Sequence, residues 1–331
     1  MQQRTLGQTA LTVTPIGLGL AALGRPGYIN LGHATDLQGE YEIEKMESHT
    51  HTVLDAAWDL GIRYFDAARS YGRAEAFLAS WLTSRQIAPD MVTVGSKWGY
   101  TYTAEWRVEA DQHEVKEHSP AVLQRQTQES LDLLGQYLDV YQIHSATLES
   151  GVLNNEEVLA ELARLRDTGL KIGLSISGPD QAKTLKRAMD ITFSEAPLFA
   201  SVQATWNLLE QSAGETLRAA KEAGMGIIIK EALANGRLTG RNDARTFIVK
   251  RALLEEIAAR YNTTIDALAL AAVLAQPWVD VVLSGAATVE QLRSNAAAPT
   301  LTLSQETVAL LQTLAEPSEI YWAIRSHLAW N

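Results

Sequence analysis

Short apolar runs rich in β-branched residues alternate with amphipathic stretches along the whole chain. The apolar runs have the length and composition of buried strands and occupy eight ranges: 13–20, 61–66, 91–98, 138–145, 170–177, 200–207, 225–231 and 279–285. Apolar residues recur at helical spacing in 49–60, 73–83, 121–134, 155–167, 179–188, 213–223, 264–275 and 288–297. Strands that alternate with helices pair in parallel through right-handed crossovers. Eight such units predict a closed (β/α)8 TIM barrel, which takes about 250 residues plus insertions.

Three longer stretches read as irregular: 23–47, 99–119 and 316–331. The first two follow strands, so we expect them at the C-terminal face of the barrel, where barrels of this kind hold their sites. No stretch between the units has the composition of an interdomain linker. One domain is therefore expected to cover 1–331.

Aromatic residues are frequent in these irregular stretches: Tyr28, Tyr41, Tyr100, Tyr102, Trp106, Tyr321, Trp322 and Trp330. An aromatic rim around a site would bury apolar or ring-shaped substrates. Alternatively the rings only cover the barrel mouth, which is the simpler interpretation for any single one of them.

Composition excludes several classes of function. The 331 residues include 28 Lys and Arg against 39 Asp and Glu, a net charge of −11 without a basic block, so nucleic acid is not an expected partner. Cysteine is absent, which excludes disulfides, thiolate metal sites and cysteine nucleophiles. His49 and His51 lie two residues apart and would not share a helix face, so no metal is expected. No signal layout and no apolar run of about 18 residues occurs, and we expect a cytoplasmic protein without membrane contact.

Four polar residues stand at or near the ends of neighbouring predicted strands: Asp66, Tyr71, Lys97 and His144. A phenol donates a proton poorly near neutral pH unless a cation stabilises its phenolate, and Lys97 could be that cation. Asp66 would fix the lysine and compensate its charge, while His144 would orient a substrate oxygen toward Tyr71. Such a set protonates an oxygen but supplies no electrons, so a carbonyl reduction would need a hydride from a nicotinamide cofactor. Taken singly, each residue also has a structural interpretation as an ordinary buried or loop residue.

The segments around these residues resemble the catalytic segments of the aldo-keto reductase family. The matching segments are Tyr64-Phe65-Asp66-Ala67-Ala68-Arg69-Ser70-Tyr71-Gly72, Ser96-Lys97 and Tyr141-Gln142-Ile143-His144, and the resemblance continues in order through 171–175, 202–209, 234–240 and 284–292. By this resemblance the chain is a barrel that binds NADP(H), or less often NAD(H), without a Rossmann domain. Tyr71 would be the general acid or base of a carbonyl–alcohol interconversion, supported by Lys97 and Asp66, with His144 orienting the substrate.

The resemblance also implies a set of cofactor contacts: Gly19, Asp66, Ser175, Gln203, Trp206, Lys230, Leu233, Leu238, Gly240, Ser284, Gly285, Gln291 and Asn295. Ile176 stands where many members have Asn, which removes one hydrogen-bonding partner of the nicotinamide. Lys230-Glu231 replaces a frequent Tyr-Ser, and Trp206 is expected to supply the missing aromatic ring. NADP is favoured by the family's habit, with NAD kept open.

Charge at the adenosine end bears on that choice. NADP-specific members commonly place Lys or Arg around 285–291 to meet the 2′-phosphate, and this chain has neither there. Arg293 and the backbone N–H groups of the helix from Thr288 remain to hold a phosphate.

A separate hypothesis is that Lys230 binds an anionic group of the substrate or the cofactor. The alternative is a simple pair with a nearby acid such as Glu231.

Two other classes of function stay open. The family includes β subunits of voltage-gated potassium channels, so a cofactor-binding regulatory subunit is one alternative. A barrel reduced to ligand binding is another, favoured only by Ile176 and Lys230. The expected partner is a small carbonyl or alcohol, and neither its identity, the direction of reaction nor the oligomeric state follows from the sequence.

Overall fold

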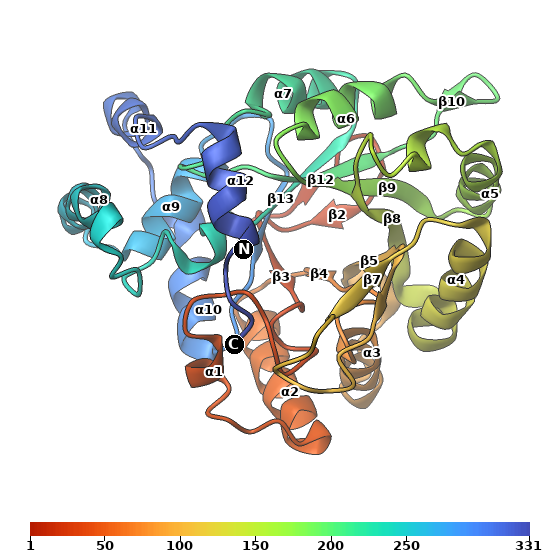
Figure 1. Ribbon diagram of the computed structural model, residues 1–331, viewed down its shortest axis with the longest axis horizontal. Coiled ribbons are helices and arrows are strands. Elements are labelled where there is room, and N and C mark those ends of the chain that lie inside the picture. Colours follow the sequence, from red (N-terminus) through yellow and green to blue (C-terminus); the bar gives the residue numbers. More distant parts are fainter.

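Eight parallel strands close into a barrel at the centre of the computed structural model, which describes residues 1–331 (Figure 1). Around the barrel the hydrogen-bonded order is β12, β13, β14, β3, β4, β5, β8 and β9, and every pair is parallel. The bounds are β3 (Ile16–Gly19), β4 (Tyr64–Asp66), β5 (Thr93–Trp98), β8 (Leu138–Ala146), β9 (Lys171–Ile176), β12 (Ser201–Thr205), β13 (Gly226–Lys230) and β14 (Val281–Ser284). The predicted fold class is confirmed, and all eight predicted strands are present.

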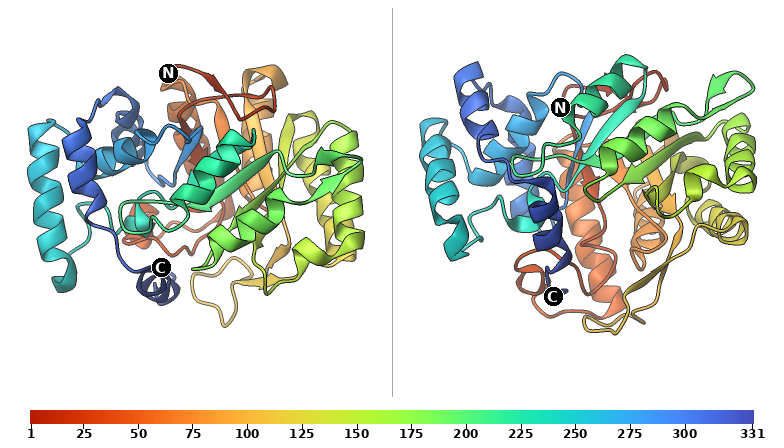
Figure 2. Two further views of the ribbon diagram at one scale, coloured as in Figure 1. Left: turned by 90° about the horizontal axis from the view of Figure 1, so that it is seen from above. Right: turned by 45° about the horizontal axis from the view of Figure 1, so that its top comes forward.

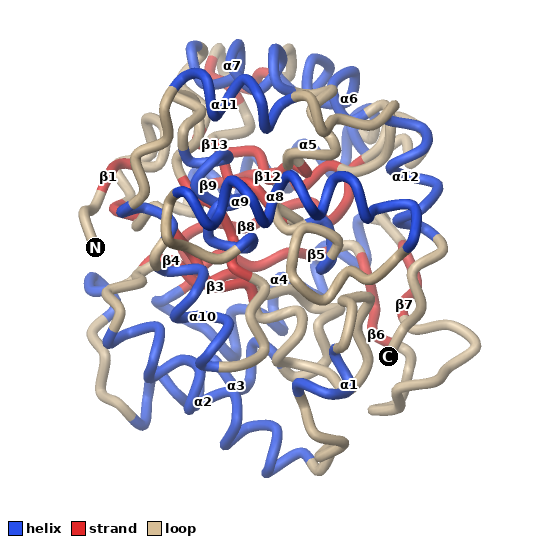
Figure 3. Tube along the Cα trace, turned by 90° about the vertical axis from the view of Figure 1, so that its left-hand side faces the viewer, coloured by secondary structure: helices blue, strands red, loops and turns tan.

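Helices surround the strands on all sides (Figure 3). The eight predicted helices are α2 (Ile43–Asp59), α3 (Ala74–Ser84), α4 (Pro120–Leu134), α5 (Glu156–Asp167), α6 (Gln181–Met189), α7 (Gly214–Glu222), α9 (Ile265–Leu274) and α10 (Val289–Ala296). Side-chain caps explain where several begin, since Ser119, Asn155, Thr264 and Thr288 each accept a hydrogen bond from a backbone N–H of the first turn.

Parts of the stretches expected to be irregular are in fact ordered. They contain α1 (His33–Asp36), the antiparallel pair β6 (Tyr100–Tyr102) and β7 (Glu114–Lys116), and α12 (Ser318–Ser326), and α2 begins inside the first of them. Further elements without a predicted counterpart are β1 (Arg4–Thr5), β2 (Thr12–Val13), β10 (Thr192–Phe193), β11 (Ala196–Pro197), α8 (Ile248–Arg260) and α11 (Gln305–Gln312). Helix α8 lacks a clean amphipathic pattern because its apolar Ile248 and Val249 are exposed.

The barrel interior is filled from the N-terminal end. Leu6 and Val13, in and beside the β1–β2 hairpin, are fully buried and pack in one cluster with Tyr64. Gly17 and Gly95 leave room for that ring, since a Cβ on Gly17 would lie 2.7 Å from its Cδ1 and one on Gly95 would lie 2.7 Å from its hydroxyl. The core thus closes one end and leaves the other for a site.

At the opposite end, loops and the C-terminal tail gather over the strand ends. Figure 2 shows the two termini at opposite ends of the barrel. The backbone of Asn331 exchanges two 3.1 Å hydrogen bonds with that of Tyr28, and its side-chain amide donates to the backbone oxygen of Asn30 at 2.9 Å. The tail therefore joins the loop that follows β3. No helix combines the length and the apolar character that a membrane crossing requires.

Candidate active site

Asp66, Tyr71, Lys97 and His144 come together at the C-terminal ends of β4, β5 and β8. The Lys97 ammonium Nζ lies 2.5 Å from Asp66 Oδ2 and 3.4 Å from the Tyr71 hydroxyl. The Tyr71 ring meets the His144 ring edge to face, with centroids 5.5 Å apart. Parallel strands place their carboxyl ends at one edge, which is why residues so far apart in sequence converge.

Asp66 is held on both of its oxygens. Oδ2 accepts from Lys97, and Oδ1 accepts from Gln203 Nε2 at 2.8 Å and from Gln142 Nε2 at 3.4 Å. Lys97 is fully buried and also donates to the backbone oxygen of Ala67 at 2.8 Å. Its ammonium therefore has a fixed position and a compensating charge.

Tyr71 is a neutral phenol in this environment. Burial raises its pKa far above the ordinary value, and the Asp66 carboxylate raises it further. The nearby Arg25 guanidinium works in the opposite direction without outweighing them. Tyr71 thus carries a proton to give at any physiological pH.

His144 is a neutral imidazole. Burial lowers its pKa well below the ordinary value, and Lys97, Arg25 and Lys230 lower it further by charge repulsion. Nδ1 lies 3.4 Å from Ser70 Oγ, and the His144 backbone oxygen is 2.9 Å from the ring nitrogen Nε2 of His118. A neutral ring held in this way can orient an oxygen without competing for the proton of Tyr71.

A cavity of about 450 Å3 opens above this cluster. Twelve of the residues expected in the site line it: Gly19, Asp66, Tyr71, His144, Gln203, Lys230, Leu233, Gly240, Ser284, Gly285, Gln291 and Asn295. Lys97 lies beneath the cavity floor, bonded to Asp66. The size and lining are those of a small-molecule site.

Three expected cofactor contacts do not line the cavity. Trp206 is 3% exposed and packs edge to face against Trp278 in the hydrophobic core, so the expectation that it replaces the missing aromatic ring is wrong. Leu238 is fully buried in a second apolar cluster. The Ser175 hydroxyl accepts the backbone N–H of Ser145 at 2.8 Å, which turns it toward the strand.

The aromatic rim is smaller than the sequence suggests. Only Tyr28, Tyr100 and Trp330 of the expected rings line the cavity. Trp106 donates to the Tyr41 backbone oxygen at 2.5 Å, and the two pack in a separate cluster with Phe77. The remaining rings, Tyr102, Tyr321 and Trp322, lie outside the lining.

Arg25 is a lining residue that the sequence analysis missed. It is 3% exposed, pairs with Glu114 at 2.9 Å and donates to the Ser70 backbone oxygen at 2.9 Å. Its guanidinium carbon lies 4.8 Å from the Trp330 ring centre and 5.3 Å from that of Tyr71. The sequence feature that could have identified Arg25 is its position as the single charge in Gly24-Arg25-Pro26-Gly27, soon after the first barrel strand.

The β14 side of the cavity holds a polar cluster that was also missed. Both oxygens of Asp36 accept from Arg241, at 2.8 and 2.6 Å, and Gln291 Nε2 donates to Asp36 at 2.9 Å. Asn235 and Asn295 each keep a buried side-chain oxygen without a hydrogen-bond donor. Two lining acceptors in need of donors fit a ligand with amino or hydroxyl groups, as a dinucleotide has.

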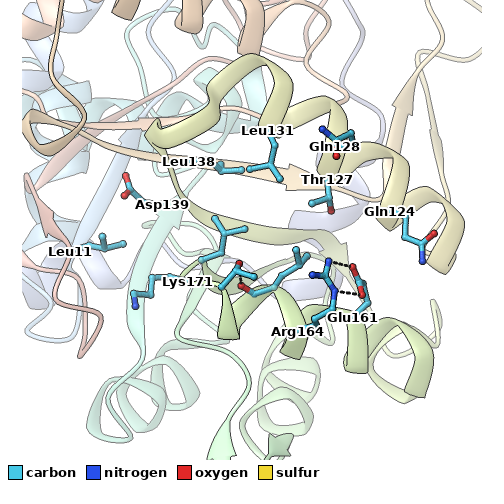
Figure 4. Close-up of a pocket in the computed structure, with 14 residues that line it drawn as sticks. Leu11, Gln124, Thr127, Gln128, Leu131, Leu138, Asp139, Glu161, Arg164 and Lys171 are labelled. Carbon is cyan, nitrogen blue, oxygen red and sulfur yellow. Dashed lines mark hydrogen bonds and ion pairs between the residues drawn. The ribbon is translucent and has the colours of Figure 1, made fainter.

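A second hollow, of about 880 Å3, lies between α4 and α5 on the outside of the barrel (Figure 4). Its lining includes Asp139, Lys171 and the pair Glu161–Arg164, whose charged groups bond to each other. None of the four predicted catalytic residues lines it. Three of the four line the smaller cavity at the strand ends instead.

Comparisons with known proteins identify the family of the chain. The sequence profile of the Aldo/keto reductase family matches residues 15–316. An NADH-specific methylglyoxal reductase of Escherichia coli (strain K12) is 26% identical over 345 residues, covering 96% of this chain and 100% of the relative. A pyridoxal 4-dehydrogenase of Microbacterium luteolum is 27% identical over 336 residues, covering 89% and 92%. The solved structure of an aldo-keto reductase from Bacillus halodurans in its holo form superposes with a TM-score of 0.73 at 23% identity, covering 96% of this chain and 97% of that one, and shares the fold. The chain belongs to the aldo-keto reductase family.

Proposed function

We propose that this protein is an NAD(P)H-dependent oxidoreductase that reduces an aldehyde or ketone to an alcohol, or runs the reverse reaction, with Tyr71 as general acid or base. One observation carries the proposal: the Tyr71 hydroxyl faces Lys97 Nζ at 3.4 Å, and that ammonium is bonded to Asp66 beneath a ligand-sized cavity. Two relatives, a methylglyoxal reductase and a pyridoxal 4-dehydrogenase, support a carbonyl–alcohol couple by the reactions in their names.

Each residue has a separate role in the proposed reaction. The bound cofactor supplies a hydride to the carbonyl carbon. His144 holds the carbonyl oxygen beside the phenol, and Tyr71 gives its proton to that oxygen as negative charge develops. The raised pKa of Tyr71 suits this step because the acceptor is an alkoxide, a stronger base than a phenolate. Lys97 stabilises the charge left on the phenol, and Asp66 keeps the lysine in position.

Several lining residues suit a nicotinamide dinucleotide. Ser284, Gln291 and Asn295 lie at the β14 end, where the family resemblance puts the adenosine, and Asn295 keeps a free acceptor. Gln203 lies at the other end and contacts Asp66, beside the predicted catalytic residues. We propose these four residues as contacts of the cofactor.

We further propose NADH as the better cofactor, which revises the preference for NADP drawn from the sequence. The Asp36 carboxylate bonds to Gln291, inside the segment where NADP-specific relatives carry cations, and it occupies the guanidinium of Arg241. A 2′-phosphate brought to this segment would meet a carboxylate, at an electrostatic cost. Arg293, the cation named from the sequence, is exposed to solvent.

We also propose that residues 1–331 act as one domain, since the tail, the loop after β3 and the strand ends all contribute to one cavity.

The test is a pair of measurements on the purified protein. Calorimetric titration with NADH and NADPH reports cofactor binding, and the absorbance of the reduced nicotinamide reports turnover with methylglyoxal and with benzaldehyde. Cofactor binding together with aldehyde-dependent oxidation is the expected result. Failure to bind either cofactor would overturn the proposal.

A further inference from the structure

The charges around the catalytic cavity do not pair off completely. Four carboxylates each hold one cation at short range: Asp66 with Lys97 at 2.5 Å, Glu114 with Arg25 at 2.9 Å, Glu231 with Arg325 at 2.7 Å, and Asp36 with Arg241 at 2.6 Å. A fifth cation, Lys230, also lines the cavity. Its Nζ lies 3.9 Å from the nearest carboxylate oxygen, that of Glu231.

Glu231 binds Arg325 more closely than it binds Lys230. Its Oε1 accepts two hydrogen bonds from Arg325, at 3.2 and 2.7 Å, and its Oε2 accepts from the Thr205 hydroxyl at 3.4 Å. Burial alone would raise the pKa of Glu231, but Arg325 and Lys230 outweigh it and lower the value to about 2. The Lys230–Glu231 pair considered from the sequence is therefore present, but only as a long contact of 3.9 Å, while Arg325 binds the same carboxylate at 2.7 Å.

Lys230 instead rests on a neutral group. Its Nζ donates to Thr205 Oγ1 at 2.7 Å and to no other atom. An ammonium carries three donors, so two remain for a ligand. The side chain is 16% exposed, at the end of β13, and its exposed atoms belong to the cavity lining.

We propose that Lys230 binds an anionic group, a carboxylate or a phosphate, of the carbonyl substrate in the catalytic cavity. The inference rests on the proposed function and narrows its substrate class to anionic carbonyl compounds. The substrate is a better source of the anion than the cofactor's diphosphate because Lys230 lines the same cavity as Asp66 and His144, and the adjacent strand β12 carries Gln203, which bonds to Asp66. A ligand anion there would complete a fifth close pair around the cavity.

The protonation of Lys230 adds a dependence on pH. Burial lowers its pKa to about 8, with Arg325 and Lys97 adding to the shift and Glu231 and Asp66 opposing it. The other groups that face it are the Thr205 hydroxyl and His144, and His144 is already neutral. Preference for an anionic substrate is therefore full below about pH 7 and falls as pH rises through the Lys230 pKa of about 8.

The experiment compares 4-carboxybenzaldehyde with its methyl ester in the wild type and in Lys230→Met. A charge-assisted hydrogen bond predicts that kcat/KM for the carboxylate falls about 10-fold to 100-fold in the variant, while that for the ester stays within about twofold. Lys186→Met, at an exposed position on α6, is the matched control and should change neither value. Lys230→Arg should keep most of the preference, which separates loss of charge from loss of folding.

Two further binding measurements distinguish the possible roles of Lys230. If Lys230→Met weakens NADH binding and leaves the ratio of the two aldehydes unchanged, the lysine holds the cofactor's diphosphate and the proposal is overturned. Calorimetry with benzoate and benzamide on the protein saturated with cofactor needs no turnover. Selective loss of benzoate binding in Lys230→Met supports the anion subsite even where no aldehyde is reduced, and in that case only the proposed reaction fails. Equal binding of benzoate by both proteins overturns the subsite.

Discussion

Tyr71 shows how a single side chain depends on three neighbours. Burial and the Asp66 carboxylate keep it protonated, and Lys97 lies on the side where charge would build when the proton leaves. Lys97 does not keep the phenol of Tyr71 permanently ionised. In the proposed mechanism it stabilises the phenolate only while the proton is being transferred.

Tyr71→Phe removes the proton donor and keeps the ring. We expect kcat/KM for aldehyde reduction to fall about a thousandfold, the usual scale for loss of a general acid, because the hydroxyl that would give the proton is removed. The affinity for NADH should change by no more than about twofold, since the ring still fills the same space. Steady-state kinetics and calorimetry on the same preparations check both statements. Retention of activity with unchanged pH dependence would contradict the assigned role.

Gly17→Ala tests the packing of the barrel interior. The added methyl would meet the Tyr64 ring at 2.7 Å, with Val281 and Leu283 side chains only slightly farther away. Overpacking of this kind costs about 2 kcal/mol, which lowers Tm by about 4 °C in a chain of this length. Gly240→Ala is the control because no atom lies within 4 Å of its added carbon. Equal melting temperatures for the two variants would argue against the tight fit.

At the scale of elements, Asp139 in β8 is held in an unfavourable charge state. Its Oδ2 accepts the backbone N–H of Val94 at 2.9 Å, and it lines the outer hollow between α4 and α5 (Figure 4). Burial raises its pKa to about 6, above its ordinary value. Folding therefore favours the protonated carboxyl of Asp139. The stability that this preference contributes is present at low pH and is lost as pH rises through the pKa of about 6.

Asp139→Asn should therefore stabilise the protein above that range. We expect a gain of about 1 kcal/mol near pH 8, after allowing for screening at a partly exposed site. The difference from wild type should disappear near pH 4. Thermal melting curves at both pH values provide the check, with Asp190→Asn, at an exposed position, as the control. A destabilised variant at pH 8 would show that the Val94 contact outweighs the buried charge.

How well each helix or strand can be predicted from the sequence depends on how it is packed. The strands are buried on both faces, so several leave short apolar runs such as that at 227–229 in β13. Helix α12 was missed because one side carries cavity groups such as Arg325 while Tyr321 and Trp322 are buried on another. The four predicted catalytic residues could be singled out because strand ends are conspicuous in the sequence. The partners of Asp36 lie more than 200 positions away and leave no local pattern.

For the molecule as a whole, the loop after β3 meets the loop after β13 through Asp36 and Arg241. This pair links two distant parts of the chain across the β14 side of the cavity. It also leaves the guanidinium of Arg241 engaged by a carboxylate beside Gln291.

Wild-type protein should bind NADH at least about tenfold more tightly than NADPH, a difference of about 1.4 kcal/mol. Asp36→Asn keeps an acceptor for Gln291 and releases Arg241 from its ion pair, so the preference should shrink by about tenfold. Calorimetric titrations with both cofactors measure the change. If instead the wild type prefers NADPH and Arg293→Met abolishes that preference, the interpretation drawn from the sequence holds and the one drawn from Asp36 does not.

Trp330 gives the molecule an optical property that follows from its place in the fold. Of the eight tryptophans, it alone lines the catalytic cavity, where its ring stacks on His113 at 3.9 Å and lies beneath the Arg25 guanidinium. The emission of an indole responds to nearby charge, and a ligand that enters the cavity changes what surrounds this ring while the seven others keep their packing. The protein thus carries an intrinsic fluorescent reporter at its own entrance, and a Trp330→Phe variant would identify which part of the emission it contributes.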